Sequence, residues 1–169
     1  FDTFWMDGYD WVEDGMNPIE TIVFDLDGTL VDSVRDVGAI LQQMRQERGL
    51  CETDDSDIRY WSSRGGHEMI RAILGCADEE ADFLLDDFRT RYAERPTDPA
   101  SLYAGVDSVL STLSSRGFSI ALCTNKPQQL TEKVLSELSI RDYFHSVVCG
   151  DTLERKKPDP QPLIEAIRR

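Results

Sequence analysis

The 169-residue chain lacks any long apolar run, and no basic segment leads into one. These absences argue against a membrane-spanning helix and against a secretory signal peptide. Basic residues are also few, since 18 Lys and Arg stand against 32 Asp and Glu, for a formal net charge of -14. This acidic balance argues against nucleic acid and anionic membranes as partners. A phosphate-bearing ligand would therefore need cations placed locally, as a metal ion or as individual Lys and Arg side chains.

Paired cysteines are lacking as well. Four cysteines are scattered without a C-x-x-C pair, at Cys51, Cys76, Cys123 and Cys149, which argues against a metal or redox role. Cys123 and Cys149 end apolar runs and are predicted to be small core residues. Reduced thiols and a cytoplasmic setting follow as the default. The sequence also contains no internal repeat and no low-complexity tract.

The first 15 residues carry five acids and no Lys or Arg. Two interpretations of this segment are open. It is either an extension upstream of a native start at Met16, or an aromatic and acidic arm, with Trp5 and Trp11, that docks on a partner or on the protein itself. Chain ends are usually poorly ordered, which favours an N-terminal extension over residues 1–15.

The most informative pattern is the run Ile22–Ser33, in which an apolar strand ends in Asp25 and Asp27. Asp is a poor strand former, and ligands of open α/β sheets bind at the carboxyl ends of strands. Two acids alternating there suggest an attacking carboxylate and a proton-transfer partner. The plainer alternative is a strand that runs into a turn, because Asp-Gly-Thr is a common turn sequence.

Helical spacing of apolar residues follows this run. Asp32 or Ser33 is well placed as an N-cap, and we expect Asp32 to be a cap rather than a catalyst. Helical patterns cover residues 34–44, 68–74 and 79–92, and a Pro-containing linker covers residues 95–99. Residues 34–102 are therefore predicted to form an all-helical insert.

Strands and helices then alternate to the end of the chain. Strands are predicted at 118–123 and 147–149, and helices at 106–113, 130–138 and 160–168. This alternation predicts an α/β fold with a doubly wound parallel sheet, a Rossmann-like core, and right-handed crossovers. The core would comprise residues 16–33 and 103–169.

Two more polar groups follow predicted strands. The turn Thr124–Pro127 offers a hydroxyl, an amide and backbone N–H groups that can donate to a phosphoryl oxygen. Its plainer alternative is a turn that caps the next helix. The loop 150–160 carries Lys156 and Lys157, and a Lys fixed by the next Pro suits a carboxylate and a phosphate. Its plainer alternative is a solvated basic loop.

Taken in order, Asp25–Ser33, Thr124–Pro127 and Gly150–Leu163 resemble the first three motifs of the haloacid-dehalogenase-like hydrolases. Together with Tyr103–Val106, the amino-acid sequences of these motifs are similar to those of the bacterial phosphoglycolate phosphatases of that superfamily. The resemblance implies a Rossmann-like core with a helical cap at 34–102. It also implies a Mg²⁺-dependent phosphatase that acts on a small phosphorylated metabolite, with 2-phosphoglycolate as the expected substrate. The alternatives are a sugar-phosphate mutase of the same superfamily and an inactive fragment.

The resemblance also implies roles for individual residues. Asp25 would attack phosphorus to form an aspartyl-phosphate, and Asp27 would protonate the leaving alcohol and then activate water. The Asp25 carboxylate and the Asp27 backbone carbonyl would bind Mg²⁺.

The two later motifs supply the phosphate-binding residues that the resemblance implies. Thr124 would bind the transferring phosphoryl group, with Asn125 as an assisting donor. Lys157 would hold Asp25 and offset the phosphate charge. Lys156 is the rival for that role, but the Lys directly before Pro fits the motif better.

The sequence departs from this family after Lys157. Family members have a fourth motif, a strand that ends in one or two acids, whereas residues 158–169 offer only Asp159 and Glu165, neither after a strand. We therefore expect a C-terminally truncated enzyme, with Ile22 and Phe24 of the first strand partly uncovered.

Within the insert, Arg64–His67 is the most polar and flexible point. It is interpreted either as a loop that contacts an anion, with Arg64 pairing a carboxylate, or as a simple turn between helices, which we favour.

Overall fold

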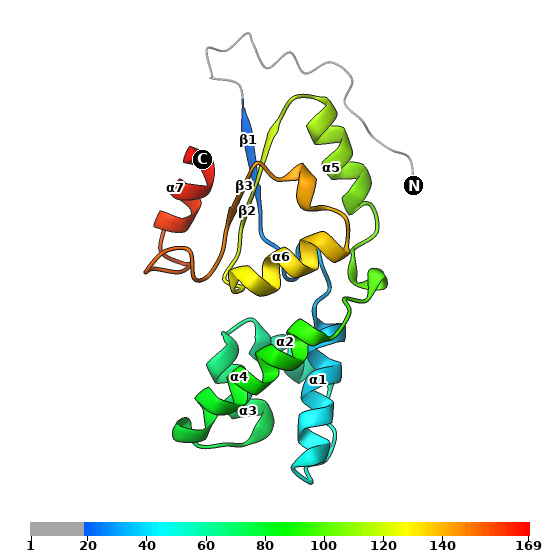
Figure 1. Ribbon diagram of the computed structural model, residues 1–169, viewed down its shortest axis with the longest axis vertical. Coiled ribbons are helices and arrows are strands. Elements are labelled where there is room, and N and C mark those ends of the chain that lie inside the picture. Colours follow the sequence, from blue (N-terminus) through cyan, green and yellow to red (C-terminus); the bar gives the residue numbers. More distant parts are fainter. Residues whose placement is uncertain (1–18) are drawn as a thin grey trace.

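A computed structural model of the chain describes residues 19–169, so the segment 1–15 and both interpretations of it lie outside the described residues. The described part contains a three-stranded parallel sheet and seven α-helices (Figure 1). In chain order the elements are β1 (Thr21–Phe24), α1 (Val34–Glu47), α2 (Asp55–Ser62), α3 (Gly66–Leu74), α4 (Asp78–Glu94), η1 (Pro99–Ser101), α5 (Val106–Ser115), β2 (Ser119–Cys123), α6 (Gln128–Glu137), η2 (Arg141–Tyr143), β3 (Ser146–Val148) and α7 (Gln161–Arg168).

The sheet has the order β1-β2-β3 with every pair parallel, as the alternation of strands and helices predicts. Side chains alternate between its two faces. Ala121 and Cys123 of β2 pack with Ala166 of α7, whereas Ile120 and Leu122 join the large core on the opposite face. The helices α5 and α6 lie on that opposite face (Figure 1). These are the layers of an α/β fold.

The strand β1 lies at one edge of the described sheet. Each of its four residues is only half-buried, including Ile22 and Phe24, whereas Ile120 and Leu122 of the adjacent β2 are fully buried. The partial exposure expected for the first strand is therefore present.

The helices α1 to α4 lie together at one end of the sheet and form the helical insert (Figure 1). Apolar side chains from all four helices fill its interior, among them Leu41, Ile58, Ile70 and Leu85. The helix α2 was not predicted as a separate element. Ile58 is its one buried residue, so the apolar periodicity is too short to indicate a helix.

Two chain segments connect the insert to the sheet, and they run side by side. Val31 and Leu102 form an antiparallel bridge. The Asp32 N–H donates to the Ser101 carbonyl at 2.7 Å, and the Tyr103 N–H donates to the Leu30 carbonyl at 3.0 Å. The chain therefore enters and leaves the insert through two adjacent segments that are joined by backbone hydrogen bonds.

The N-cap position of α1 falls on one of the two predicted residues, Ser33, whereas the cap role expected of Asp32 is wrong. Ser33 occupies the N-cap position, but its side chain makes no capping hydrogen bond. The Asp32 carboxylate instead pairs with Nη2 of Arg59 at 3.2 Å. Because Arg59 belongs to α2, a helix that the sequence did not reveal, this partner could not be predicted.

The cysteines agree with the sequence prediction. Cys123 and Cys149 are buried, and all four cysteines are free thiols. Burial raises the pKa of both buried thiols, which keeps them protonated and unreactive. None of the described helices combines the length and the apolar composition that crossing a membrane requires.

Candidate active site

Three loops meet where the three strands end. Asp25 follows β1, Thr124 follows β2, and the loop 149–160 follows β3. Parallel neighbouring strands bring their carboxyl ends to one edge of the sheet, which is where ligands of open α/β sheets bind. The three motifs, far apart in the sequence, are thereby gathered in one place.

Asp25 is held by contacts to both of its carboxylate oxygens. Lys157 Nζ lies 3.0 Å from Asp25 Oδ2, and the Leu26 N–H donates to Asp25 Oδ1 at 2.8 Å. The same Lys157 ammonium donates to the Cys123 carbonyl at 2.8 Å, which fixes it at the end of β2. Lys156 is exposed. The structure thus brings Lys157, and not its rival Lys156, to the carboxylate.

The Asn125 side chain is hydrogen-bonded to the backbone of the loop that follows β3. Its Nδ2 donates to the Lys157 carbonyl at 3.1 Å, and its Oδ1 accepts from the Lys157 N–H at 3.0 Å. The side chain therefore links two loops and orients the backbone of Lys157. Phosphoryl binding by Asn125 stays a prediction.

Close approach of two backbone segments tightens this link. The Gly150 N–H donates to the Lys126 carbonyl at 2.9 Å. A Cβ atom added at Gly150 would lie 2.1 Å from the Asn125 carbonyl oxygen. Only glycine permits this approach.

Thr124 is buried, and its backbone N–H donates to the Val148 carbonyl at 2.9 Å. Its Oγ1 accepts from the Lys126 N–H at 3.2 Å. A hydroxyl that accepts one hydrogen bond still has its own proton to donate. Thr124 therefore retains a donor at the edge of the sheet where Asp25 lies.

Lys126 belongs to the site although the sequence assigned it no role. Its Nζ lies 3.2 Å from Asp27 Oδ1 and 4.3 Å from the ring centroid of Tyr92 in α4. Burial by itself lowers the pKa of Lys126, but Asp27 and Tyr92 outweigh it and raise the pKa to about 12. The group is therefore a permanent cation beside the second aspartate. Its place in the Thr124–Pro127 motif was the one signal available.

The protein supplies few donors for a metal. Among residues 19–169 no group of three or more His, Cys, Asp or Glu is arranged to hold an ion. Asp159 accepts from the Gln161 N–H at 2.9 Å and pairs with Arg155, so it serves the start of α7. The ligands that the family resemblance implies are the Asp25 carboxylate and the Asp27 backbone carbonyl, which would hold the ion after the end of β1. This set fits Mg²⁺, which keeps several waters and uses one or two carboxylates plus substrate phosphate.

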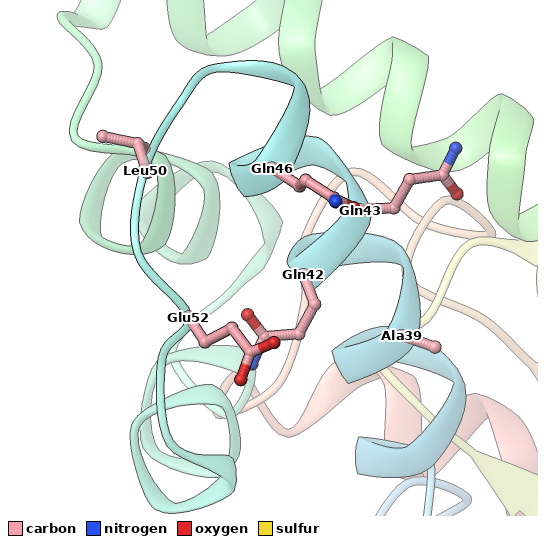
Figure 2. A pocket seen from close by; sticks show the side chains of 6 residues that line it. All are labelled: Ala39, Gln42, Gln43, Gln46, Leu50 and Glu52. Carbon is pink, nitrogen blue, oxygen red and sulfur yellow. The ribbon is translucent and has the colours of Figure 1, made fainter.

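Two other features of the insert lie apart from these contacts. Arg64 stacks 4.4 Å from the ring centroid of Tyr60, in a turn between α2 and α3 where Gly65 has a φ of 111°. A hollow of about 350 Å³ lies along α1 (Figure 2). Gln42, in its lining, bonds through both amide atoms to the backbone of Thr53. The hollow therefore belongs to the packing of the insert.

The fold and the three motifs define a haloacid dehalogenase-like hydrolase. The model of that family matches residues 22–169, and the chain belongs to it. A phosphoglycolate phosphatase from Nitrosococcus oceani is 38% identical over 153 residues, which cover 87% of this chain and 68% of that protein. An N-acetylmuramic acid 6-phosphate phosphatase from Pseudomonas aeruginosa is 33% identical over 150 residues, covering 88% and 66%.

Solved structures agree with this assignment. A crystal structure described as a predicted phosphoglycolate phosphatase from Haemophilus somnus has a TM-score of 0.80 and 25% identity, covering 89% of this chain and 71% of that one. The chain thus spans about two thirds of the length of the relatives it matches. The α/β fold with a helical insertion and the family resemblance are both confirmed.

Proposed function

We propose that this chain is a Mg²⁺-dependent phosphomonoesterase that works through an aspartyl-phosphate on Asp25. The observation that carries the proposal is the contact of 3.0 Å between Lys157 Nζ and Asp25 Oδ2 at the end of β1. A carboxylate beside a fixed cation, at the ligand-binding edge of an α/β sheet, suits attack on a phosphate ester. The phosphatase names of the relatives support the same reaction class.

Asp25 would attack the phosphorus, and the bond to the leaving oxygen would break as the aspartyl-phosphate forms. Asp27 would give a proton to the departing alkoxide and later take a proton from the water that hydrolyses the intermediate. Lys157 would offset the charge of the transferring group, and Thr124 would donate to one of its oxygens. Mg²⁺ bound by Asp25 and the Asp27 carbonyl would supply further neutralisation of phosphate charge.

The substrate is proposed to be a small phosphomonoester, with 2-phosphoglycolate first among the candidates. Two relatives named for different substrates have similar identities to this chain. Both named substrates are phosphomonoesters that also carry a carboxylate. Residues 16–33 and 103–169 are proposed to form the catalytic core, and the insert 34–102 is proposed to be the cap that selects among such esters.

The test is phosphate release from 2-phosphoglycolate and from N-acetylmuramic acid 6-phosphate, with and without Mg²⁺. Wild-type chain should release phosphate only with Mg²⁺, and Asp25→Asn should abolish the release while its melting temperature stays the same. Asp82→Asn makes the same change at a side chain that is 85% exposed, and it should retain full activity.

Three results would contradict the proposal. Turnover near wild type in Asp25→Asn would remove the nucleophile assignment. An isomerised sugar phosphate in place of free phosphate would indicate the mutase alternative. No release by the wild-type chain from any ester would indicate that this polypeptide is an inactive fragment.

A further inference from the structure

The side chain of Lys126 is enclosed between the sheet and the helical insert. It is only 9% exposed, whereas the Asp27 side chain that it contacts is 36% exposed. Its backbone is fixed on both sides, because its N–H donates to Thr124 Oγ1 and its carbonyl accepts from the Gly150 N–H. The ammonium therefore has little room to move.

Tyr92 encloses the Lys126 ammonium on the side of the helical insert. It lies in the last turns of α4, it is 3% exposed, and its ring packs 6.0 Å from the ring of Phe88 on the same helix. The Lys126 Nζ lies over the Tyr92 ring at 4.3 Å from the centroid, within the range of a cation–π interaction. A buried ammonium needs such partners, since desolvation of an unpaired cation is costly.

We propose that Lys126 is a positioning residue, which holds the Asp27 carboxylate and ties it to Tyr92 of the insert. Packing of α4 against α6 then fixes the orientation of the group that transfers the proton. Lys126 and Asp27 are 99 positions apart in the sequence, and the same Lys126 ammonium also contacts Tyr92 of α4. The catalytic part of this inference rests on the proposed function, because it assumes that Asp27 is the acid and base.

A neighbouring lysine offers a matched control. Lys133 lies in α6, with its Nζ 5.9 Å from the centroid of the same Tyr92 ring. Its ammonium donates to Glu137 at 2.6 Å and to Thr97 Oγ1 at 3.1 Å. Lys133 thus joins α6 to the segment after α4 beside the same tyrosine, through hydrogen bonds to Glu137 and Thr97 rather than to Asp27.

The first experiment measures the contact without any turnover. The chain has four lysines, Lys126, Lys133, Lys156 and Lys157, so acylation by an amine-reactive anhydride can be followed at each by mass spectrometry. Lys126 should react far more slowly than the exposed Lys156. Tyr92→Leu and Asp27→Asn should each raise the Lys126 rate about 5-fold, the ratio expected for loss of one such partner. Lys156 should not change, and an unchanged Lys126 rate in both variants would overturn the proposed contact.

The second experiment asks whether the contact serves proton transfer. An alkyl ester such as 2-phosphoglycolate needs an acid for its leaving group, whereas p-nitrophenyl phosphate has a leaving group that departs unprotonated. Lys126→Met should lower kcat/KM about 100-fold for the alkyl ester, the effect of a misplaced acid. It should lower kcat/KM only a few-fold for the aryl ester. The comparison uses kcat/KM because kcat also includes hydrolysis of the aspartyl-phosphate, a step that is the same for both esters and also uses Asp27. Lys126→Arg, which keeps the charge, should recover part of the loss.

Variants around the lysine separate positioning from general destabilisation. Tyr92→Leu should reproduce the selective loss on the alkyl ester, and Tyr92→Phe, which keeps the ring, should retain most activity. Lys133→Met should lower the melting temperature without changing the ratio of the two kcat/KM values. An equal loss of kcat/KM on both esters in Lys126→Met, or the same change of that ratio in Lys133→Met, would overturn the proposal.

The two experiments keep this inference distinct from the proposed function. Wild-type chain that hydrolyses neither ester would contradict the phosphatase activity, and the acylation rates would then decide the contact alone. Wild-type chain that hydrolyses both esters, with the same ratio of kcat/KM values in Lys126→Met, would support the phosphatase activity and remove Lys126 from the positioning of Asp27.

Discussion

Gly150→Ala is expected to damage both the stability and the activity of this chain. Gly150 follows Cys149 in the loop after β3, and its backbone lies against that of Asn125. The added methyl carbon would lie 2.1 Å from the Asn125 carbonyl oxygen and 2.7 Å from its carbonyl carbon. Both atoms belong to the backbone, so no rotamer change can relieve the contact.

The geometry sets the size of the effect. A carbon and a carbonyl oxygen are in ordinary contact at about 3.3 Å, so the two loops must separate by about 1 Å. Overpacking of this kind costs about 1–3 kcal/mol, and we expect the upper half of that range because backbone must move. For a chain of this length, about 2–3 kcal/mol corresponds to a melting temperature lower by roughly 5–10 °C.

The same movement should reach the active site. Asn125 and Lys157 exchange two hydrogen bonds across the gap that would widen, and Lys157 holds Asp25. A misplacement of about 1 Å can cost about 100-fold in rate. Phosphate release should therefore fall by about that factor, measured at a temperature where Gly150→Ala is still folded.

Gly38→Ala is the matched control, and its expected sign is opposite. Gly38 lies within α1, where a methyl carbon would be 3.4 Å from Ile58, an ordinary packing distance. Alanine in place of glycine in a helix gains about 0.5–1 kcal/mol, so this variant should melt at or above the wild-type temperature with full activity. Equal melting temperatures and rates for Gly150→Ala and wild type would refute the reasoning, since they would show that the loops separate without cost.

Three further outcomes are expected. Burial alone would raise the pKa of Glu137, but hydrogen bonds from Lys133 and Thr97 outweigh it and lower that pKa to about 2. Wild type should therefore melt at a higher temperature than Glu137→Gln at neutral pH, and this difference should disappear as the pH falls from about 5 towards 2. An unchanged difference at low pH would contradict this. Calorimetry should find weak Mg²⁺ binding without phosphate, and tight binding would reveal a further carboxylate ligand. The half-buried edge strand β1 and the exposed apolar residues of α7 should cause self-association, which a monodisperse monomer in sedimentation would exclude.

The sequence predicted the sheet and the meeting of the three motifs because those signals are local. Each apolar strand is followed at once by its polar residues, and parallel pairing then gathers the strand ends. The same locality explains the position of Lys157, since the motif with its following proline marks one lysine out of an adjacent pair. Contacts within one loop or at one strand end could therefore be predicted from the sequence.

Contacts that depend on the packing of the insert could not be predicted from the sequence. The helix α2 has a polar sequence with one buried residue, and missing it meant missing Arg59, the partner of Asp32. The cap role given to Asp32 followed from its local position alone. Lys126 shows the same limit, because its partners Asp27 and Tyr92 are distant in the chain and no periodicity connects them. Tertiary packing of α4 against α6 decides that contact.

The electrostatics of the site follow from where the lysines are. The chain carries a formal net charge of -14 and has only four lysines. Two of these contact the paired acids, Lys157 on Asp25 and Lys126 on Asp27. A like charge about 4 Å away costs about 4 kcal/mol near a protein surface, so two bare carboxylates would repel a phosphate group strongly. With each carboxylate paired, the charge of a phosphate group would remain for the metal and the strand-end donors to offset, which the proposed function requires of an acidic protein.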